Sequence, residues 1–102
     1  MGSYSYTAVE LFAILNQSVN GNGLISLAHQ VIATLLNLKC DSISPAYVTA
    51  VTPFLAAANT LMSPPTLKVP PVGTGYLLPA ITDGITNALD NLIKTYECDQ
   101  TG

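Results

Sequence analysis

The sequence predicts an all-α fold: a small bundle of four to five helices, with a long loop rich in proline and glycine before the last helix. The strongest observation is the run 24–38, fifteen residues without a charge, a proline or a glycine, whose apolar side chains recur at helical spacing. A second helical pattern begins near Pro79, and the segment 63–79 before it is rich in proline and glycine. No internal repeat and no strand-like alternation stands out. We therefore expect helices packed around one core.

The first helix is expected over about 8–17. Thr7 and Glu10 match the capping box, in which each side chain accepts a hydrogen bond from the other residue's backbone amide. A turn rich in Asn and Gly, 16–23, then leads into the central helix, 24–38, which we expect to be buried on nearly all sides. The remaining stripe of that helix is polar but uncharged: Ser26, His29, Gln30, Thr34 and Asn37.

Two capping signals predict a short helix followed by a longer one. The Ser-Pro pair at 44–45 and the Thr-Pro pair at 52–53 each place a hydroxyl before a proline that suits the first helical position. We expect helices at 46–51 and 54–62, with a single helix kinked at Pro53 as the alternative.

The segment 63–79 is expected to be an extended loop that packs against the body of the domain. Disordered linkers lack apolar content, whereas this loop carries a good deal of it. Its apolar side chains are Leu67, Val69, Val72, Tyr76, Leu77 and Leu78.

The last helix is expected from Pro79 onward and is amphipathic. Its apolar stripe comprises Leu78, Ile81, Ile85, Ala88, Leu89, Leu92 and Tyr96, and its polar stripe comprises Asp83, Asn87, Asp90, Lys94 and Glu97. Gly84 costs this helix about 1 kcal/mol relative to alanine, unless another helix crosses closely there.

Length and charge set the broad class. The 102 residues give room for one domain, which we place at 4–99, with 1–3 as the remnant of an expression tag and 100–102 as a tail. The chain has three lysines, no arginine and six acidic residues. It therefore has too few cationic side chains to favour binding to nucleic acid or to an anionic lipid surface. The polar turn at 16–23 keeps any apolar stretch below the roughly 20 residues that span a bilayer.

The cysteines predict a disulfide rather than a metal site. Cys40 and Cys98 stand beside charged residues near predicted helix ends, which favours a bond between them, with two free thiols as the alternative. One histidine and two distant cysteines form no metal-ligand pattern. Asp83, Asp90 and Glu97 recur every seven residues, and we interpret them as a solvated helix face rather than a calcium site. No cofactor is expected.

His29, the only histidine, is the first candidate for a functional site. Gln30 lies about 100° around the helix from it, so the two could line one polar seam. We interpret His29 as a hydrogen-bonded structural residue, with ligand binding through His29 and Gln30 as the alternative. A triad of Ser26, His29 and Asp90 can be drawn, but any chain of this size permits such a set. We therefore assign no catalytic residue and predict that the chain is not an enzyme.

Two further motifs are weaker signals. Asn16-Gln17-Ser18 matches the glycosylation sequon, which makes Asn16 an acceptor only in a eukaryotic secretory setting. Tyr4 and Tyr6 could stack on sugars or cover the edge of the core, and we favour the second role. Neither motif by itself assigns a function.

Residues 10–16, ELFAILN, are followed after a glycine-containing turn by residues 27–37, LAHQVIATLLN. This order resembles a helical domain of unknown function in secreted microbial multidomain proteins, in which an L-x-x-L-N helix precedes L-A-H-Q-x-I-A-x-x-L-N. The likeness covers the first 40 residues, and residues 56–61, Leu89-Asp90 and Cys98 follow the same order more loosely. Members usually begin with G-[YF]-W-K-x-H, whereas this chain has no tryptophan. The resemblance implies an extracellular or cell-surface module and no established activity.

The sequence therefore predicts a secreted, non-catalytic module that serves structure or recognition within a larger extracellular or cell-surface protein or assembly. The alternative is a carrier of a small apolar, lipid-like ligand, with a cavity in the helical core closed by Met62, Phe12 and the loop 63–79. An enzyme that uses His29 would need further groups from a partner domain.

The weakly charged surface predicts association with other protein domains or with copies of the chain itself. Only 9% of the residues are charged, so electrostatic repulsion between molecules is small. If a preceding segment normally covers the first helix, its absence leaves the Leu11 and Leu15 side exposed, and exposed apolar patches commonly mark interaction sites.

Overall fold

The computed structural model describes residues 6–39, 44–64 and 69–96. These residues form four helices and no strand: α1 (Ala8–Leu15), α2 (Gly23–Leu38), α3 (Pro45–Met62) and α4 (Pro79–Thr95). The all-α bundle with a long loop before its last helix is therefore confirmed. Over the same residues, no helix combines the length and the apolar character needed to cross a membrane.

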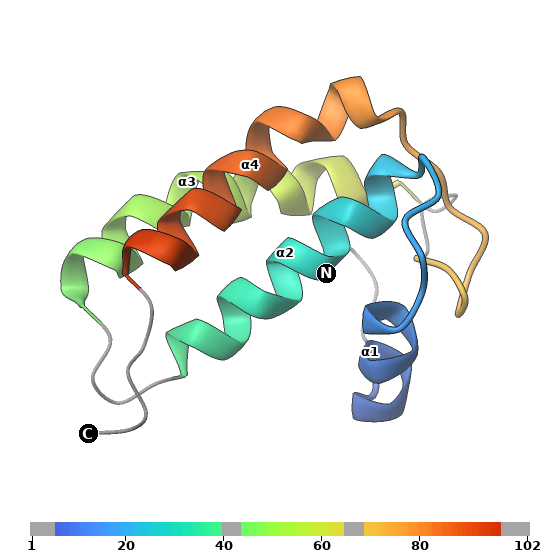
Figure 1. Cartoon of the computed structure of the whole chain (residues 1–102), viewed down its shortest axis with the longest axis horizontal. Helices are drawn as coiled ribbons and strands as arrows, with labels where there is room; N and C mark the ends of the chain where they lie inside the picture. Colours follow the sequence, from blue (N-terminus) through green and yellow to red (C-terminus); the bar gives the residue numbers. More distant parts are fainter. Residues whose placement is uncertain (1–5, 40–43, 65–68, 97–102) are drawn as a thin grey trace.

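The three long helices lie alongside one another, and α1 lies to one side at an angle to them (Figure 1). α2 and α4 run in the same direction from neighbouring N-termini, because a Cβ added at Gly23 would lie 2.9 Å from both the Leu78 carbonyl oxygen and the Pro79 Cα. α3 runs the opposite way, so that the ring of Tyr47 at its start lies 5.9 Å from the ring of Tyr96 just after α4. The central position expected for 24–38 is confirmed, since α2 contacts each of the other three helices.

The core is built from apolar side chains of all four helices and of the loop before α4. α2 contributes the largest share, as expected for a helix without charges. The fully or almost fully buried apolar residues are Ile14, Leu24, Ile25, Leu27, Ala28, Val31, Ile32, Tyr47, Val51, Ala58, Met62, Val69 and Leu89.

α1 begins as expected and ends two residues early. The Thr7 amide donates to Glu10 Oε1 at 2.9 Å and the Glu10 amide donates to Thr7 Oγ1 at 3.2 Å, which confirms the capping box. The helix stops at Leu15 rather than 17, because the chain then turns through Asn20 and Gly21, whose φ angles of 46° and 78° are left-handed. α1 is therefore only eight residues long.

The expectation of two helices at 46–51 and 54–62 is wrong: α3 is one helix that continues through Pro53. The hydroxyl of Thr52 caps no new helix and instead donates to the Val48 carbonyl at 2.7 Å. Pro53 is exposed, so its ring faces solvent, and the helix carbonyl that lacks an N–H donor from proline is on the same exposed side. One buried stripe continues across the proline and favours a single helix: Tyr47, Val51, Ala58 and Met62.

The apolar stripe expected at the start of the last helix is also partly wrong. Leu78 and Ile81 are 57% and 50% exposed, whereas Thr82 and Thr86 are buried. The side chain of Thr82 lies against the position that a Cβ of Gly23 would occupy. Small side chains let α4 approach α2 closely here, and larger apolar residues could not fit.

The loop before α4 is held to the body chiefly by Asn22, the N-cap of α2. Its Oδ1 accepts hydrogen bonds from the Leu24 amide at 3.0 Å and the Leu77 amide at 3.3 Å, and its Nδ2 donates to the Gly75 carbonyl at 2.9 Å. The Gly23 amide also donates to the Leu77 carbonyl at 2.7 Å. The described part of the loop thus packs against the bundle, as its apolar content predicts.

Candidate functional site

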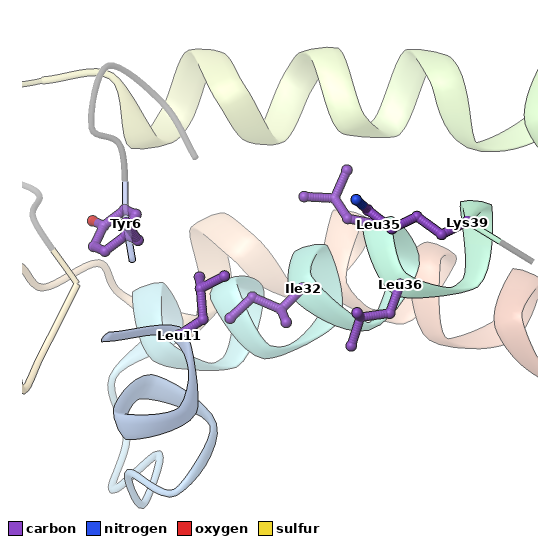
Figure 2. A pocket seen from close by; sticks show the side chains of 6 residues that line it. All are labelled: Tyr6, Leu11, Ile32, Leu35, Leu36 and Lys39. Carbon is purple, nitrogen blue, oxygen red and sulfur yellow. The ribbon is translucent and has the colours of Figure 1, made fainter. Parts of the chain in front are cut away.

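A shallow apolar hollow runs along the C-terminal half of α2. Its volume is about 210 Å³, and Figure 2 shows the side chains around it. Tyr6 and the α1 residue Leu11 lie at one end, and the last turns of α2 line the rest. The lining residues are Tyr6, Leu11, Ile32, Leu35, Leu36 and Lys39.

A second hollow of about 150 Å³ adjoins the first on the side of α1. It is lined by Ala8, Leu11, Phe12, Leu15, Ile32 and Leu36. The two hollows share Leu11, Ile32 and Leu36, so they form one continuous surface, which we call the α1–α2 groove.

The groove exists because α1 is shorter than the apolar face of α2 that it covers. Ile25, Ile32 and Leu36 recur on one face of α2 at helical spacing. Ile25 and Ile32 are 3% and 4% exposed, whereas Leu36 is 62% exposed. The apolar stripe of α2 therefore continues beyond the part that α1 protects.

α1 itself exposes apolar side chains on the side away from the core. Seven of its eight residues are apolar, and Glu10 is the exception. Ile14 is fully buried, whereas Val9 and Phe12 are 78% and 65% exposed. A helix that is apolar on all sides is typical of buried positions, and α1 is covered on only one side.

The groove carries little charge. Among residues 6–39 the charged side chains are Glu10 in α1 and Lys39 at the end of α2. Lys39 is exposed and lines the far end of the first hollow, while Glu10 is partly buried beside its capping partner Thr7. The groove is thus suited to apolar groups, with one cationic position at its edge.

His29 positions α1. Its Nε2 lies 2.6 Å from the carbonyl oxygen of Ile14, and since a carbonyl can only accept, the imidazole is the donor. This contact is the kind that the structural interpretation of His29 requires. Gln30 is half-buried, and its helical spacing places it on the same face of α2 as Gly23 and Thr34. Binding through His29 and Gln30 stays a prediction.

In the described structure, the hydrogen bond of His29 supports neither the triad with Ser26 and Asp90 nor a metal site. Its Nε2 bonds a backbone carbonyl rather than Ser26 or Asp90. Asp90 instead pairs with Lys94 at 2.8 Å, one turn further along α4, which fits the solvated face expected there. Within the described ranges, no group of three or more histidine, cysteine or acidic side chains lies close enough together to hold a metal ion.

Several polar side chains of α2, α3 and α4 are buried, and the sequence only partly indicated this. Thr34 was expected on the polar stripe of α2, and it is fully buried. Across the described residues, several buried oxygens have no hydrogen-bond partner: Gln30 Oε1, Thr34 Oγ1, Tyr47 OH and Thr86 Oγ1. These atoms reduce stability, because burial removes the hydration of a polar group and no protein hydrogen bond replaces it.

The structure places some of the other residues that the sequence singled out, while the rest lie outside the described residues. Tyr6 packs against the core and accepts a hydrogen bond from the Val69 amide at 3.0 Å, so it covers the edge of the core as expected. Asn16 is exposed at the C-cap of α1, where a glycan would be accessible. Cys40, Cys98 and the residues Tyr4 and Glu97 lie outside the described residues.

The exposure of Phe12 and Leu36 was not predicted from the sequence. Both fit helical apolar patterns that usually indicate core positions. The available signal was the composition of α1, which is apolar on every side but too short to be covered on every side by one neighbour.

Comparison of the chain with protein-family models, with curated proteins and with solved structures finds no match. The resemblance of residues 10–16 and 27–37 to a helical domain of secreted microbial proteins therefore stays a prediction.

Proposed function

We propose that this protein is a non-catalytic recognition module of a larger secreted or cell-surface protein, and that it binds the apolar face of another protein in the α1–α2 groove. The observation that carries the proposal is the exposure of Phe12 and Leu36, 65% and 62%, on one continuous apolar surface. Soluble proteins rarely leave such side chains together in contact with water unless they bind something.

The shape of the groove favours a helix or a short apolar segment as the bound element. Grooves between two helices commonly receive an amphipathic helix, which inserts side chains at i, i+3 or i+4, and i+7. The two adjoining hollows, which meet at Leu11, Ile32 and Leu36, would take successive side chains of such a helix. Lys39 at the rim favours a partner that carries an acidic residue there.

The proposed location outside the cell rests on the resemblance and on the cysteine pair. A disulfide between Cys40 and Cys98 would require an oxidising compartment. A weakly charged surface suits a module that lies beside other domains of one assembly. Neither argument assigns a particular partner.

The alternative, a carrier of a small apolar ligand, has less support. Carrier sites are usually enclosed cavities of roughly 300–1,000 Å³. The larger hollow is about 210 Å³ and lies at the surface. Met62 is buried in the bundle, whereas Phe12 lines the surface groove, so these two residues do not close one cavity in the way the carrier hypothesis requires.

The proposal can be tested by selecting helical peptides from a displayed library on the immobilised protein, kept at low micromolar concentration. Each selected peptide is then measured against the wild type, Leu36→Glu and Val48→Glu by isothermal titration calorimetry. Val48 on α3 is a matched control, because it is an exposed aliphatic residue, at 42%, that lines neither hollow.

We expect peptides whose affinity falls at least tenfold with Leu36→Glu and changes little with Val48→Glu, since a buried unpaired charge costs far more than an exposed one. Peptides that are equally sensitive to both variants, or a selection that enriches none, would argue against recognition through the groove. Extraction of purified protein and mass spectrometry address the carrier alternative, which requires a lipid bound in stoichiometric amount.

A further inference from the structure

We infer that the turn before α2 is a site of spontaneous covalent modification: Asn20 converts to aspartate and isoaspartate through a cyclic succinimide, whereas the neighbouring Asn22 is protected by the loop before α4. Neither asparagine lines the α1–α2 groove, and the inference does not depend on the proposed function. It is carried by the contrast between two asparagines that are each followed by a glycine.

The sequence places two Asn-Gly pairs next to each other, Asn20-Gly21 and Asn22-Gly23. Asparagine reacts most readily when glycine follows it, because glycine has no Cβ to obstruct its own backbone nitrogen and lets the chain bend freely. The chain contains no other Asn-Gly pair. The two pairs therefore share the same local chemistry, and the folded environment is what distinguishes them.

The reaction starts at the backbone nitrogen of the glycine. Base removes the proton of this amide, and the nitrogen attacks Cγ of the asparagine side chain. The new N–Cγ bond closes a five-membered succinimide ring, while the Cγ–Nδ2 bond breaks and the side-chain nitrogen takes up a proton and leaves as ammonia. Water then opens the ring at either carbonyl and gives aspartate or isoaspartate. One water is consumed and one ammonia is released, and nothing is oxidised or reduced.

Asn20 and Gly21 are free to react. Both are exposed, and their φ angles of 46° and 78° are the left-handed pair of a type I′ turn. The turn is closed by the Asn22 amide, which donates to the Val19 carbonyl at 2.8 Å. Among the residues that the structure describes, neither the side chain of Asn20 nor the amide of Gly21 makes a hydrogen bond. Base therefore reaches the nitrogen, and no contact has to break before the side chain turns toward it.

Asn22 and Gly23 are held in place at both reacting groups. The Asn22 Oδ1 accepts from the Leu24 and Leu77 amides at 3.0 Å and 3.3 Å, and its Nδ2 donates to the Gly75 carbonyl at 2.9 Å. The attacking nitrogen is protected as well, because Gly23 is buried and its amide donates to the Leu77 carbonyl at 2.7 Å. Succinimide formation at Asn22 therefore requires the loop to leave first.

The reaction at Asn22 thus reports how often the loop before α4 opens. Three of these four hydrogen bonds come from Gly75 and Leu77 of the loop, which lies beside the start of α2 (Figure 1). The product is also different from the starting state, since an aspartate at position 22 has no Nδ2 to donate to the Gly75 carbonyl. An opening that lasts long enough for the reaction is therefore recorded irreversibly in the chain.

The two rates are measured on folded wild-type protein kept at pH 8 and 37 °C, with protein unfolded in guanidinium chloride as the reference. Samples are digested with pepsin at acidic pH, where the reaction is slow. Electron-transfer fragmentation then assigns each conversion to Asn20 or Asn22 and distinguishes aspartate from isoaspartate. We expect comparable rates at both positions in the unfolded chain. In the folded protein we expect Asn20 to react at least tenfold faster, because the reaction at Asn22 requires local opening.

The protection by the loop is tested with Leu77→Ala and Tyr76→Ala. The side chain of Leu77 packs against the core, whereas its neighbour Tyr76 is 52% exposed and serves as the matched control. Circular dichroism verifies that both variants are folded. We expect Leu77→Ala to raise the rate at Asn22 at least threefold and to leave the rate at Asn20 unchanged. Tyr76→Ala should change neither rate.

The comparison within the wild type decides the inference even if Leu77→Ala does not fold. Equal rates at Asn20 and Asn22 in the folded protein would overturn it, as would an Asn20 that reacts only in guanidinium chloride. A rate at Asn20 that does not rise between pH 6 and pH 8 would exclude attack by the deprotonated amide. An unchanged rate at Asn22 in folded Leu77→Ala would show that the loop is not what protects it.

Discussion

His29 on α2 joins the carbonyl of Ile14 on α1 through a hydrogen bond of 2.6 Å. The carbonyl belongs to the last turn of α1, where it also accepts a hydrogen bond from the Gln17 amide at 3.1 Å. Ile14 is also the one α1 side chain that is fully buried. This residue pair therefore contributes both a polar and an apolar attachment of α1, beside the packing of Leu11 against the core.

The first prediction concerns this attachment. His29→Ala removes the donor and should lower the free energy of unfolding by about 1–2 kcal/mol. His29→Gln keeps an N–H donor at a similar reach and should retain most of that stability. Urea denaturation gives the stability, and hydrogen exchange should show the loss of protection concentrated in α1. Equal destabilisation by both variants would contradict a role through the hydrogen bond.

The second prediction uses two helical glycines as a matched pair. A Cβ at Gly84 meets nothing within 4 Å, so no helix crosses closely there and Gly84→Ala should stabilise the protein by about 1 kcal/mol. A Cβ at Gly23 meets the backbone of Leu78 and Pro79, each at 2.9 Å, so Gly23→Ala should destabilise it by about 1–3 kcal/mol. Thermal and urea unfolding of both variants measure these changes. If Gly23→Ala were neutral, α2 and α4 would not be in contact at their N-termini.

The third prediction concerns the buried hydroxyl of Thr34. It has no hydrogen-bond partner among the described residues, so Thr34→Val removes a desolvated polar group without changing the shape of the side chain. We expect the free energy of unfolding to rise by about 1 kcal/mol. Thr52→Val is the control, since Thr52 is exposed, and surface changes usually stay within about 0.5 kcal/mol. A loss of stability with Thr34→Val would mean that a water molecule or another group bonds this hydroxyl.

The fourth prediction concerns Asn22, which caps α2 and holds the loop before α4. Asn22→Ala removes one cap and two hydrogen bonds to the loop, and should cost about 2–3 kcal/mol. Asn22→Asp keeps the acceptor for Leu24 and Leu77 but loses the donor to Gly75, so its cost should be smaller. The two variants are compared by urea denaturation. A loss with aspartate as large as that with alanine would show that the bond to Gly75, which both variants lack, dominates.

The fifth prediction is that Cys40 and Cys98 form a disulfide in the native protein. The bond would close a loop of about 58 residues and would stabilise the fold by about 4 kcal/mol on the chain-entropy argument. Alkylation without reductant, followed by mass spectrometry, should modify neither cysteine. Two alkylated thiols in freshly purified, folded protein would rule the bond out.

The starts of α1 and α3 could be predicted from the sequence because their capping signals are local. The cap at Thr7 and the Ser44-Pro45 start depend on residues within one turn, and both are observed. The continuation through Pro53 could not be predicted in the same way, because it depends on a buried stripe that spans the proline and on the solvent outside it.

The groove was harder to predict because exposure depends on the neighbour and not on the residue itself. Leu36 continues the apolar face of α2 as regularly as Ile32 does. Leu36 is exposed and Ile32 is buried because α1 is too short to cover both. The hydrogen bonds of Asn22 to Gly75 and Leu77 likewise join residues more than 50 positions apart, which no local pattern reveals.

The parallel arrangement of α2 and α4 has a consequence for the order of folding. α2 and α3 form an antiparallel hairpin with a short connection, so they can pair early and locally. α4 must cross the length of the bundle before it can lie beside α2, and the contacts that secure this step are those of Asn22 and Gly23 with the loop. The hydrogen bonds of Asn22 join residues more than 50 positions apart, and closing so long a stretch of chain is costly, so we expect them to form late in folding. Contacts that form late act mainly on the unfolding rate, so we expect the rate at which α4 detaches to decide how long the native state survives.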